Sequence, residues 1–507
     1  MYLQGFLAVL TNPVIWVMMA AGVTVGIIFG SIPGLTATMA ITMCLPMTYA
    51  MEPIPAISVL VALYIGGISG GLISAILLNI PGTPSSIATT FDGAPMAAKG
   101  HAARALGIGV FYSFLGTLFG LICLLAVAPQ LAKIAIQFGP FDYCAISIFS
   151  LALVIALAGK DFLKGILSAL LGIMLATVGL SPLDSMKRFT FGMTELNSGF
   201  QLLTVLIGLY AITEIAGEAW EAVHPKKMSI RKVEKIKGFG FSLREFKKNL
   251  GNFFVSALIG TGIGILPGIG GGTAGMMAYT VQKTKSKEPE KFGEGCMEGI
   301  VASETSNNAV IGGAMVPLLS LGIPGDGATA MLLGGLMIHG VSTGPLVFQK
   351  SGDVVYGIYA AMLACAFLML IIETVGMRAF INVLKVPRNY LLPVVVVMCC
   401  IGAFGNTNRT FDVMAVVFFG FIGYLMTKAA LPAPPLVLGF ILGPMFEENL
   451  RRASQYVMLD ASELYSHPIA DVFVIAAVAV VIVILRSRKK QAVREKAKEE
   501  KEQEEQK

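Results

Sequence analysis

Two matched pairs of Pro-Gly breaks interrupt long apolar stretches, and they constrain the fold of this chain more than any other feature. One pair is Ile80-Pro-Gly-Thr83 and Ile323-Pro-Gly-Asp326, and an upstream pair begins at Ile32-Pro-Gly and Leu266-Pro-Gly. Proline removes a backbone donor and clashes with the preceding helical turn, and glycine permits the conformations that restart the chain. Four breaks in corresponding order therefore predict two repeats, each with two interrupted helices.

The apolar composition indicates a membrane protein. Of the 507 residues, 55% are hydrophobic and 13% are charged, against about 25% charged in soluble proteins. Apolar runs of about 20 residues recur, each long enough to cross a bilayer core as a helix, and they are apolar on all faces rather than on one. We therefore predict an all-α polytopic membrane protein with two inverted repeats, re-entrant segments and roughly 10–12 membrane segments.

Equivalent loops of the two halves carry opposite charge patterns, which is the basis for predicting inversion. After the first break, the loop at Met51 has no Lys or Arg, whereas residues 283–291 hold four lysines. After the second break the pattern reverses, with Lys99 and Arg104 in the first half and only Lys350 in the second. Because cytoplasmic loops concentrate Lys and Arg, we expect Lys99–Arg104 and Lys283–Lys291 inside and Ala50–Pro55 and Gly340–Gln349 outside.

The same rule divides the chain into four parts. Nine of the 37 Lys and Arg residues lie in 219–250 and nine more in 486–507, so both regions are expected to be cytoplasmic. The predicted parts are a first transmembrane repeat (1–218), a basic connection (219–250), a second repeat with extra spans (251–485) and a charged tail (486–507). No Lys or Arg precedes Lys99, so Phe6–Gly30 is expected to be a retained first membrane segment rather than a signal peptide.

Further spans are expected after the broken helices of each half. In the first half they lie near 104–128, 141–159, 163–181 and 199–218. In the second half they lie near 354–377, 389–407, 411–428, 433–446 and 468–485, and Phe446–His467 is expected to be a loop with a surface helix. Four spans in the first half bring the chain to the basic connection on the cytoplasmic side. Five spans in the second half bring the C-terminus to the same side.

The broken helices supply the chemistry of the predicted site. Inside hydrocarbon, such breaks occur only where protein or a water-filled cavity satisfies the freed backbone groups. Restarted helices direct N–H groups and a positive dipole end at the gap, which suits a carboxylate, and we expect Thr83 and Asp326 to cap them. The substrate-binding candidates at the breaks are Gly34, Thr36, Gly82, Thr83, Ser85, Ser86, Gly268, Gly270, Gly325, Asp326 and Thr329.

Side-chain oxygens near the breaks suit a cation. Carbonyls at half-helix ends, together with Asn, Ser and Thr oxygens, can coordinate Na⁺. The candidates are Asn79, Thr89, Thr90, Ser303, Thr305, Ser306, Asn307 and Asn308. Na⁺ or H⁺ is the expected coupling ion, and no other metal or cofactor is predicted.

Several of these residues also have a purely structural interpretation. Small residues in membrane helices commonly mark close packing, and Asp326 serves equally well as a helix cap or an ion ligand. Glu298 and Glu304 are functional candidates because ionisable residues in apolar runs usually have a role. Asp92-Gly93 is typical of a turn, and Gly82 and Gly325 are expected at positive φ.

Long blocks of the sequence resemble the large membrane subunit of the bacterial tripartite tricarboxylate transporters, over about residues 10–485. They include GSIPGLTATMAITMCLP, GGLISAILLNIPGTPSSIATTFDGAPMAAKG, GILPGIGGGTA and SETSNNAVIGGAMVPLLSLGIPGDGATAMLLGGLMIHGVSTGP. The resemblance implies a secondary transporter of the inner membrane, driven by an ion gradient, that imports citrate-like carboxylates. It also implies two partners, a small membrane subunit and a periplasmic solute-binding protein. Ala94 departs from the family pattern, which has an aromatic residue there, and this departure bears on the substrate class.

Two other classes remain as alternatives. One is a passive anion channel, although two separated, inverted pairs of broken helices fit alternating access better than a fixed pore. A membrane-embedded transferase would need catalytic side chains gathered at one face, and the four histidines (His101, His224, His339, His467) are instead scattered among loops and tails. Because no such cluster is seen, the chain is not predicted to be an enzyme. The seven cysteines show no metal-ligand spacing and are expected to be small core residues.

Overall fold

The computed structural model describes residues 2–157, 161–181, 183–217, 239–383, 388–460, 462, 467–483 and 486. Within them the regular structure is helical except for two short strands, β1 (Gly179–Leu180) and β2 (Lys187–Arg188). The strands pair antiparallel, with Gly179 opposite Arg188. The predicted all-α class is confirmed.

The chain forms two compact units. The larger unit comprises Met1–Ile136 and Phe200–Ala429, and the smaller comprises Gln137–Gly199 and Ala430–Lys507. The smaller unit contains β1, β2, α7 (Pro140–Leu157), α8 (Phe162–Ala176), the 3₁₀ helix η4 (Glu195–Ser198) and α19 (Ala433–Leu459). The larger unit contains all of the Pro-Gly breaks.

The first part of the larger unit precedes residue 137. Its helices are α1 (Tyr2–Thr11), α2 (Pro13–Ser31), α3 (Ala37–Cys44), η1 (Leu45–Thr48), α4 (Pro53–Leu78), η2 (Pro84–Ser86), α5 (Ile87–Met96), the π-helix η3 (Ala97–His101) and α6 (Ala102–Ala135). The second part begins with α9 (Leu202–Leu206) and the π-helix η5 (Ile207–Ile212). It continues with α11 (Leu243–Ile265), α12 (Gly270–Lys285), η6 (Pro289–Lys291), α13 (Met297–Leu321), α14 (Gly327–Ile338), α15 (Val347–Lys350), α16 (Gly352–Val383), α17 (Arg388–Thr407) and α18 (Thr410–Lys428).

Each break is built from the same local signals in both halves. Helices α2 and α11 end just before Ile32-Pro33 and Leu266-Pro267, because a residue that precedes proline is disfavoured in helical conformation. Helices α4 and α13 end instead in left-handed caps, at Asn79 (φ 58°) and Gly322 (φ 75°). These two caps occupy equivalent positions, two residues before the break prolines.

The chain restarts after each downstream break with a capping box. Thr83 and Ser86 cap η2, and Asp326 and Thr329 cap α14 in the same way. Such a box satisfies two free N–H groups of a helix start reciprocally. The expectation that Thr83 and Asp326 are N-caps is confirmed.

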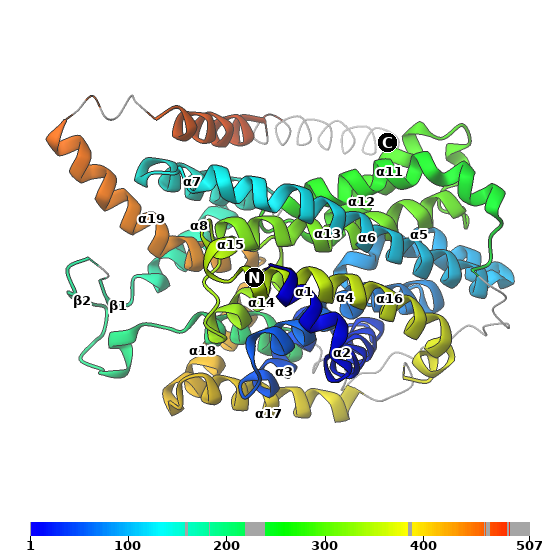
Figure 1. The fold of residues 1–507 in the computed structure, drawn as a ribbon, viewed down its shortest axis with the longest axis horizontal. Coiled ribbons are helices and arrows are strands. Elements are labelled where there is room, and N and C mark those ends of the chain that lie inside the picture. The colour runs from blue at the N-terminus through cyan, green and yellow to red at the C-terminus, as the bar shows by residue number, and fades with distance from the viewer. Residues whose placement is uncertain are drawn as a thin grey trace, which may run out of the picture. The chain divides into compact units, whose positions relative to one another are not determined.

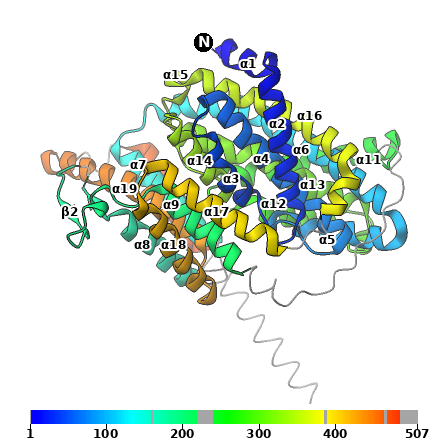
Figure 2. The same ribbon diagram turned by 90° about the horizontal axis from the view of Figure 1, so that it is seen from below.

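The helices of the larger unit pack reciprocally. Helix α2 lies on α4 as α11 lies on α13, and α16 packs on α4 as α6 packs on α13. Figure 1 shows α6 running along α13, and Figure 2 shows α2 and α16 beside α4. Across the halves, α3 contacts α14 while α12 contacts η2 and α5. Two repeats related by a pseudo-two-fold axis produce such matched contacts. The orientation of the repeats in the membrane stays a prediction.

Individual glycines repeat the same contact in each half. A Cβ at Gly26 of α2 would meet the carbonyl oxygen of Leu63, and one at Gly260 of α11 would meet that of Ser306. Gly26 and Gly260 both lie seven residues before a break proline, and Leu63 and Ser306 both lie 18 residues before one. The repeat therefore extends to single backbone contacts.

In the described part of the chain, five helices are long and apolar enough to cross a membrane, at Pro13–Ser31, Pro53–Leu78, Pro84–Ala135, Gly352–Phe380 and Thr410–Lys428. Seven shorter apolar helices accompany them, at Ala37–Thr48, Pro140–Ala156, Phe162–Ala176, Leu202–Gly217, Gly327–Ile338, Leu392–Gly405 and Pro468–Val483. The chain is a polytopic membrane protein.

Three predicted element boundaries are wrong. Phe6–Gly30 is not one segment, because Asn12 and Pro13 end α1 and start α2. The stretch from Phe446 is not a loop, because α19 continues to Leu459. Helix α8 ends at Ala176 rather than near 181, and the hairpin that follows places Arg188 in an ion pair with Glu447 of α19 (2.5 Å). Residues 219–238 of the predicted basic connection, and the tail after 486, lie outside the described residues.

Candidate functional site

The start of α12 contacts both downstream breaks. A Cβ on Gly271 would lie 3.0 Å from the Cβ of Ser85 and 2.5 Å from Oδ1 of Asn307. A Cβ on the preceding Gly270 would lie 3.7 Å from the Cβ of Asp326. Three restarted helices, η2, α12 and α14, thus begin close together, and the predicted residues Ser85, Gly270 and Asp326 share one region.

Asp326 is held by groups from both halves. Its Oδ1 accepts hydrogen bonds from the backbone N–H (2.8 Å) and the hydroxyl (2.7 Å) of Thr329. Its Oδ2 accepts one from the hydroxyl of Tyr64 on α4 (2.6 Å). Tyr64 was missed from the sequence, although the repeat could have indicated it. Tyr64 and Asn307 both lie 17 residues before a break proline, and both lie beside a restarted helix, Tyr64 at Asp326 and Asn307 at Gly271.

The upstream breaks join this region through α3. Gly34 (φ 87°) and Gly268 (φ 76°) form matching left-handed turns. Thr36 caps α3 by accepting from the N–H of Met39 (3.3 Å), and its hydroxyl donates to Glu214 (3.1 Å). Helix α3 packs on α14, which brings the first upstream break to the second downstream one.

Gly82 and Gly325 are not at positive φ, so that prediction is wrong. What they provide is a close approach of backbones. A Cβ at Gly82 would collide with the carbonyl oxygen of Gly30, and one at Gly325 would lie 2.7 Å from the equivalent oxygen of Gly264. The N–H of Gly268 also donates to the carbonyl of Gly325 (2.8 Å), so each downstream break is packed on the upstream one.

Most of the cation candidates surround Glu304 on α13 or lie near it. Its fully buried carboxylate accepts from Thr89 on α5, from Ser113 on α6 (2.9 Å) and from Nδ2 of Asn308 (3.4 Å). Thr89 also lies 3.2 Å from the hydroxyl of Ser303. Thr305, Ser306 and Asn307 are buried on the same helix. Ser113 was missed because it comes from another element.

The described contacts of Asn79 and Thr90 do not involve Glu304. Asn79 is the exposed left-handed cap of α4. Thr90 donates to the carbonyl of Ile87 (2.6 Å) within its own helix. Their assignment to a cation site stays a prediction.

A second fully buried carboxylate was also missed. Glu373 on α16 accepts from Ser69 on α4 (2.9 Å). Its signal in the sequence was the one used for Glu304, an ionisable residue in an apolar run.

Asp92 is not in a turn, as its Asp-Gly sequence predicted, but inside α5 and fully buried. Its Oδ1 accepts three backbone N–H groups from the loop before α13, those of Gly293 (3.0 Å), Gly295 (2.8 Å) and Cys296 (2.7 Å). A carboxylate that accepts several N–H bonds fixes a loop strongly. Asp92 thus ties the first repeat to the second.

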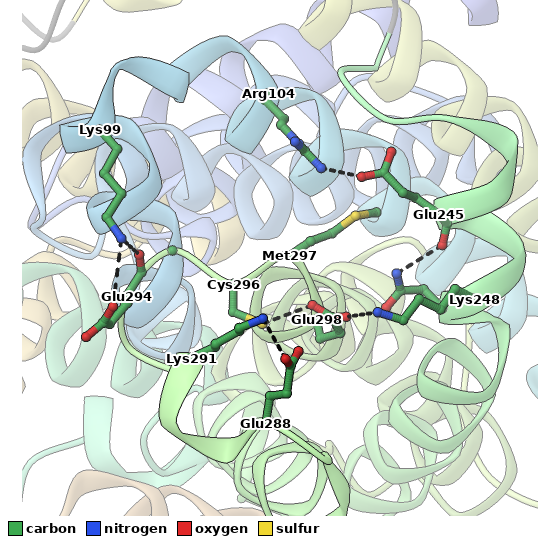
Figure 3. Close-up of a pocket in the computed structure, with 12 residues that line it drawn as sticks. Lys99, Arg104, Glu245, Lys248, Glu288, Lys291, Glu294, Cys296, Met297 and Glu298 are labelled. Atoms are coloured by element: carbon green, nitrogen blue, oxygen red, sulfur yellow. Dashed lines mark hydrogen bonds and ion pairs between the residues drawn. The ribbon is translucent and has the colours of Figure 1, made fainter.

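A charged cavity of about 470 Å³ lies at the ends of α6, α11 and α13. Figure 3 shows its ion pairs, which are Lys99–Glu294, Arg104–Glu245, Lys248–Glu298 and Lys291–Glu288. Hydrogen bonds from the backbone N–H (2.8 Å) and hydroxyl (2.9 Å) of Ser242, together with Arg104, hold the pKa of Glu245 below its usual value.

Interrupted helices that meet inside a polytopic, two-repeat bundle define a membrane transport protein. A sequence model described as the Tripartite tricarboxylate transporter TctA family matches residues 16–438, and the chain belongs to this family. It is 33% identical over 475 residues, 94% of each chain, to an "Uncharacterized 52.8 kDa protein in TAR-I ttuC' 3'region" of Agrobacterium vitis. It is 36% identical over 211 residues to an "Uncharacterized protein in TAR-II ttuC' 3'region" of the same species, covering 42% of this chain and 87% of that one. No solved structure matches. The resemblance seen in the sequence is confirmed, and the chain is a tricarboxylate transporter subunit of a tripartite system with other subunits.

Proposed function

We propose that this chain is the large membrane subunit of an ion-gradient-driven secondary transporter in the bacterial inner membrane. It imports a citrate-like di- or tricarboxylate by alternating access. A periplasmic solute-binding protein delivers the substrate, and a small membrane subunit completes the complex. Family membership supports the tripartite organisation and the carboxylate class.

The proposal rests on one observation, which is that the restarted helices η2, α12 and α14 begin close together. Each restart carries backbone N–H groups that have no intrahelical partner and the positive end of its helix dipole, and the three starts lie close together. Several such ends that face one region favour a multiply charged anion, as in transporters with discontinuous helices. In the described residues no Lys, Arg or His side chain is buried, so backbone dipoles and accompanying cations take the place of a basic side chain.

Ser85 offers a direct test, because its hydroxyl lies at the start of η2 opposite α12. The serine is buried, and its Oγ lies 2.8 Å from that of Thr83. We expect Ser85→Ala to raise the KM for citrate about tenfold, because hydrogen bonds to charged groups contribute about 1.5–3 kcal/mol. Uptake of labelled citrate by cells that express all three components measures this effect.

The matched control is Ser58→Ala, which removes a buried hydroxyl bonded to Ile54 within α4. Its KM should equal that of the wild type, and both variants should assemble at wild-type levels. An unchanged KM in Ser85→Ala would remove the start of η2 from the substrate site. Counterflow in proteoliposomes separates the transporter from a passive channel, since only an exchanging carrier accumulates external label against preloaded substrate.

A further inference from the structure

The polar cluster at Glu304 is not required by the packing of the repeat. When the break prolines Pro81 and Pro324 are aligned, Ser303, Glu304 and Asn308 of α13 correspond to Leu60, Val61 and Ile65 of α4. These three apolar side chains are all at most 1% exposed. The first repeat therefore builds the same helix with an ordinary apolar core.

The cluster also contains polar atoms that the protein leaves without partners. Four buried polar atoms on α13 have no hydrogen-bond partner among the described residues. They are Oδ1 of Asn308, Oδ1 and Nδ2 of Asn307, and Oγ1 of Thr305. A buried polar group without a hydrogen-bond partner destabilises the folded protein. Oδ1 of Asn308 belongs to the side chain whose Nδ2 bonds Glu304, and an unpaired oxygen at that place indicates a ligand that accepts its lone pair.

The sign of the charge identifies that ligand as a cation. Glu304 is buried and none of its described contacts is with a Lys, Arg or His side chain. A buried carboxylate without a counter-ion is strongly disfavoured. Hydroxyl and amide oxygens around a carboxylate are hard ligands that suit alkali and alkaline-earth ions.

We propose that Glu304, with oxygens of Thr89, Ser303 and Asn308, binds a monovalent metal cation, Na⁺, that crosses with the carboxylate substrate. This inference rests on the proposed transport function and names its coupling site. Thr89 and Ser113 donate to the carboxylate in this structure. Rotation of the Thr89 O–H about its C–O bond turns a lone pair of the oxygen toward the ion. Only the second repeat carries the site, because the first has apolar residues at the equivalent positions.

Equilibrium binding of ²²Na⁺ tests the site without substrate or transport. The complex of the large and small membrane subunits is placed in nanodiscs, and binding is measured for the wild type and for Glu304→Gln. We expect Glu304→Gln to weaken Na⁺ binding by roughly 100-fold or more, since changes to outer-shell partners alone cost 10–100-fold. Thr89→Ala, a smaller change that preserves the buried carboxyl, should weaken binding about tenfold.

Glu373→Gln is the matched control, because it neutralises a second fully buried carboxylate that hydrogen-bonds Ser69 on α4. It should bind Na⁺ as the wild type does. Wild-type affinity in Glu304→Gln would overturn the proposal, and so would equal losses in both glutamate variants. If the wild type binds no Na⁺ and Glu304→Gln instead abolishes substrate-linked proton uptake, the site holds a proton and the Na⁺ assignment is wrong. Failure of carboxylate uptake with intact Na⁺ binding would refute only the transport function.

Discussion

At the scale of single residues, the breaks depend on glycine because backbone occupies the space of a side chain. A Cβ at Gly325 would lie 2.6 Å from the Cβ of Ala314 and 2.7 Å from the carbonyl oxygen of Gly264. We expect Gly325→Ala to destabilise the folded protein by about 1–3 kcal/mol, the usual cost of overpacking. The thermal midpoint and the folded yield after detergent extraction measure this effect.

Gly262→Ala serves as the control for that substitution. Gly262 lies two residues from Gly264 on α11, has nothing within 4 Å of an added Cβ and is not at positive φ. It should fold like the wild type. Equal stability of Gly325→Ala and Gly262→Ala would show that the two breaks are not packed as described.

At the scale of elements, the sequence predicted what local chemistry determines. The Pro-Gly breaks, the caps Thr83 and Asp326 and the repeat follow from residues close in the chain. Ser113 and Glu373 were missed because their partners come from other helices, and packing rather than pattern decides which ones. Asp92 was misread because an Asp-Gly pair favours a turn locally, while three distant N–H groups hold its carboxylate within a helix.

The start of α11 should respond to acid through Glu245. The pKa of Glu245 is lowered in the folded protein, so its stabilising effect is complete above the unfolded value of about 4.3 and is lost as the pH falls through the folded pKa. We therefore expect Glu245→Gln to lower Tm at neutral pH. The difference from the wild type should shrink below about pH 4. Melting curves across this range measure the effect, and a constant difference would contradict it.

At the scale of the whole molecule, the loops expected on one side of the membrane lie together. Nζ of Lys99 donates to the carbonyl of Glu294 (2.7 Å), close to the lysine-rich loop. At the other pair of loops, the hydroxyl of Thr48 lies 3.0 Å from Nε2 of His339. This grouping agrees with the reversed charges of the two halves, whereas the side that each group faces stays a prediction.

Cysteine labelling in intact cells assigns those sides. We expect Met51→Cys to react with an impermeant thiol reagent applied from outside, and Ser286→Cys to react only after the membrane is permeabilised. The reason is the excess of lysine around Ser286 and its absence at Met51. The seven native cysteines must first be replaced. Labelling of both positions from the same side would rule out inverted repeats.

The three hydrogen bonds at Asp92 restrict which parts of the molecule are free to move. They join α5 of the first repeat to the loop that leads into α13 of the second. A motion that separated these segments would break all three bonds to one buried carboxylate, so α5 and this loop travel as one rigid body. Under the alternating access proposed above, the hinges fall elsewhere, for example at the left-handed caps Asn79 and Gly322. The segments that move together therefore do not coincide with the two sequence repeats, because α5 of the first repeat moves with the loop before α13 of the second.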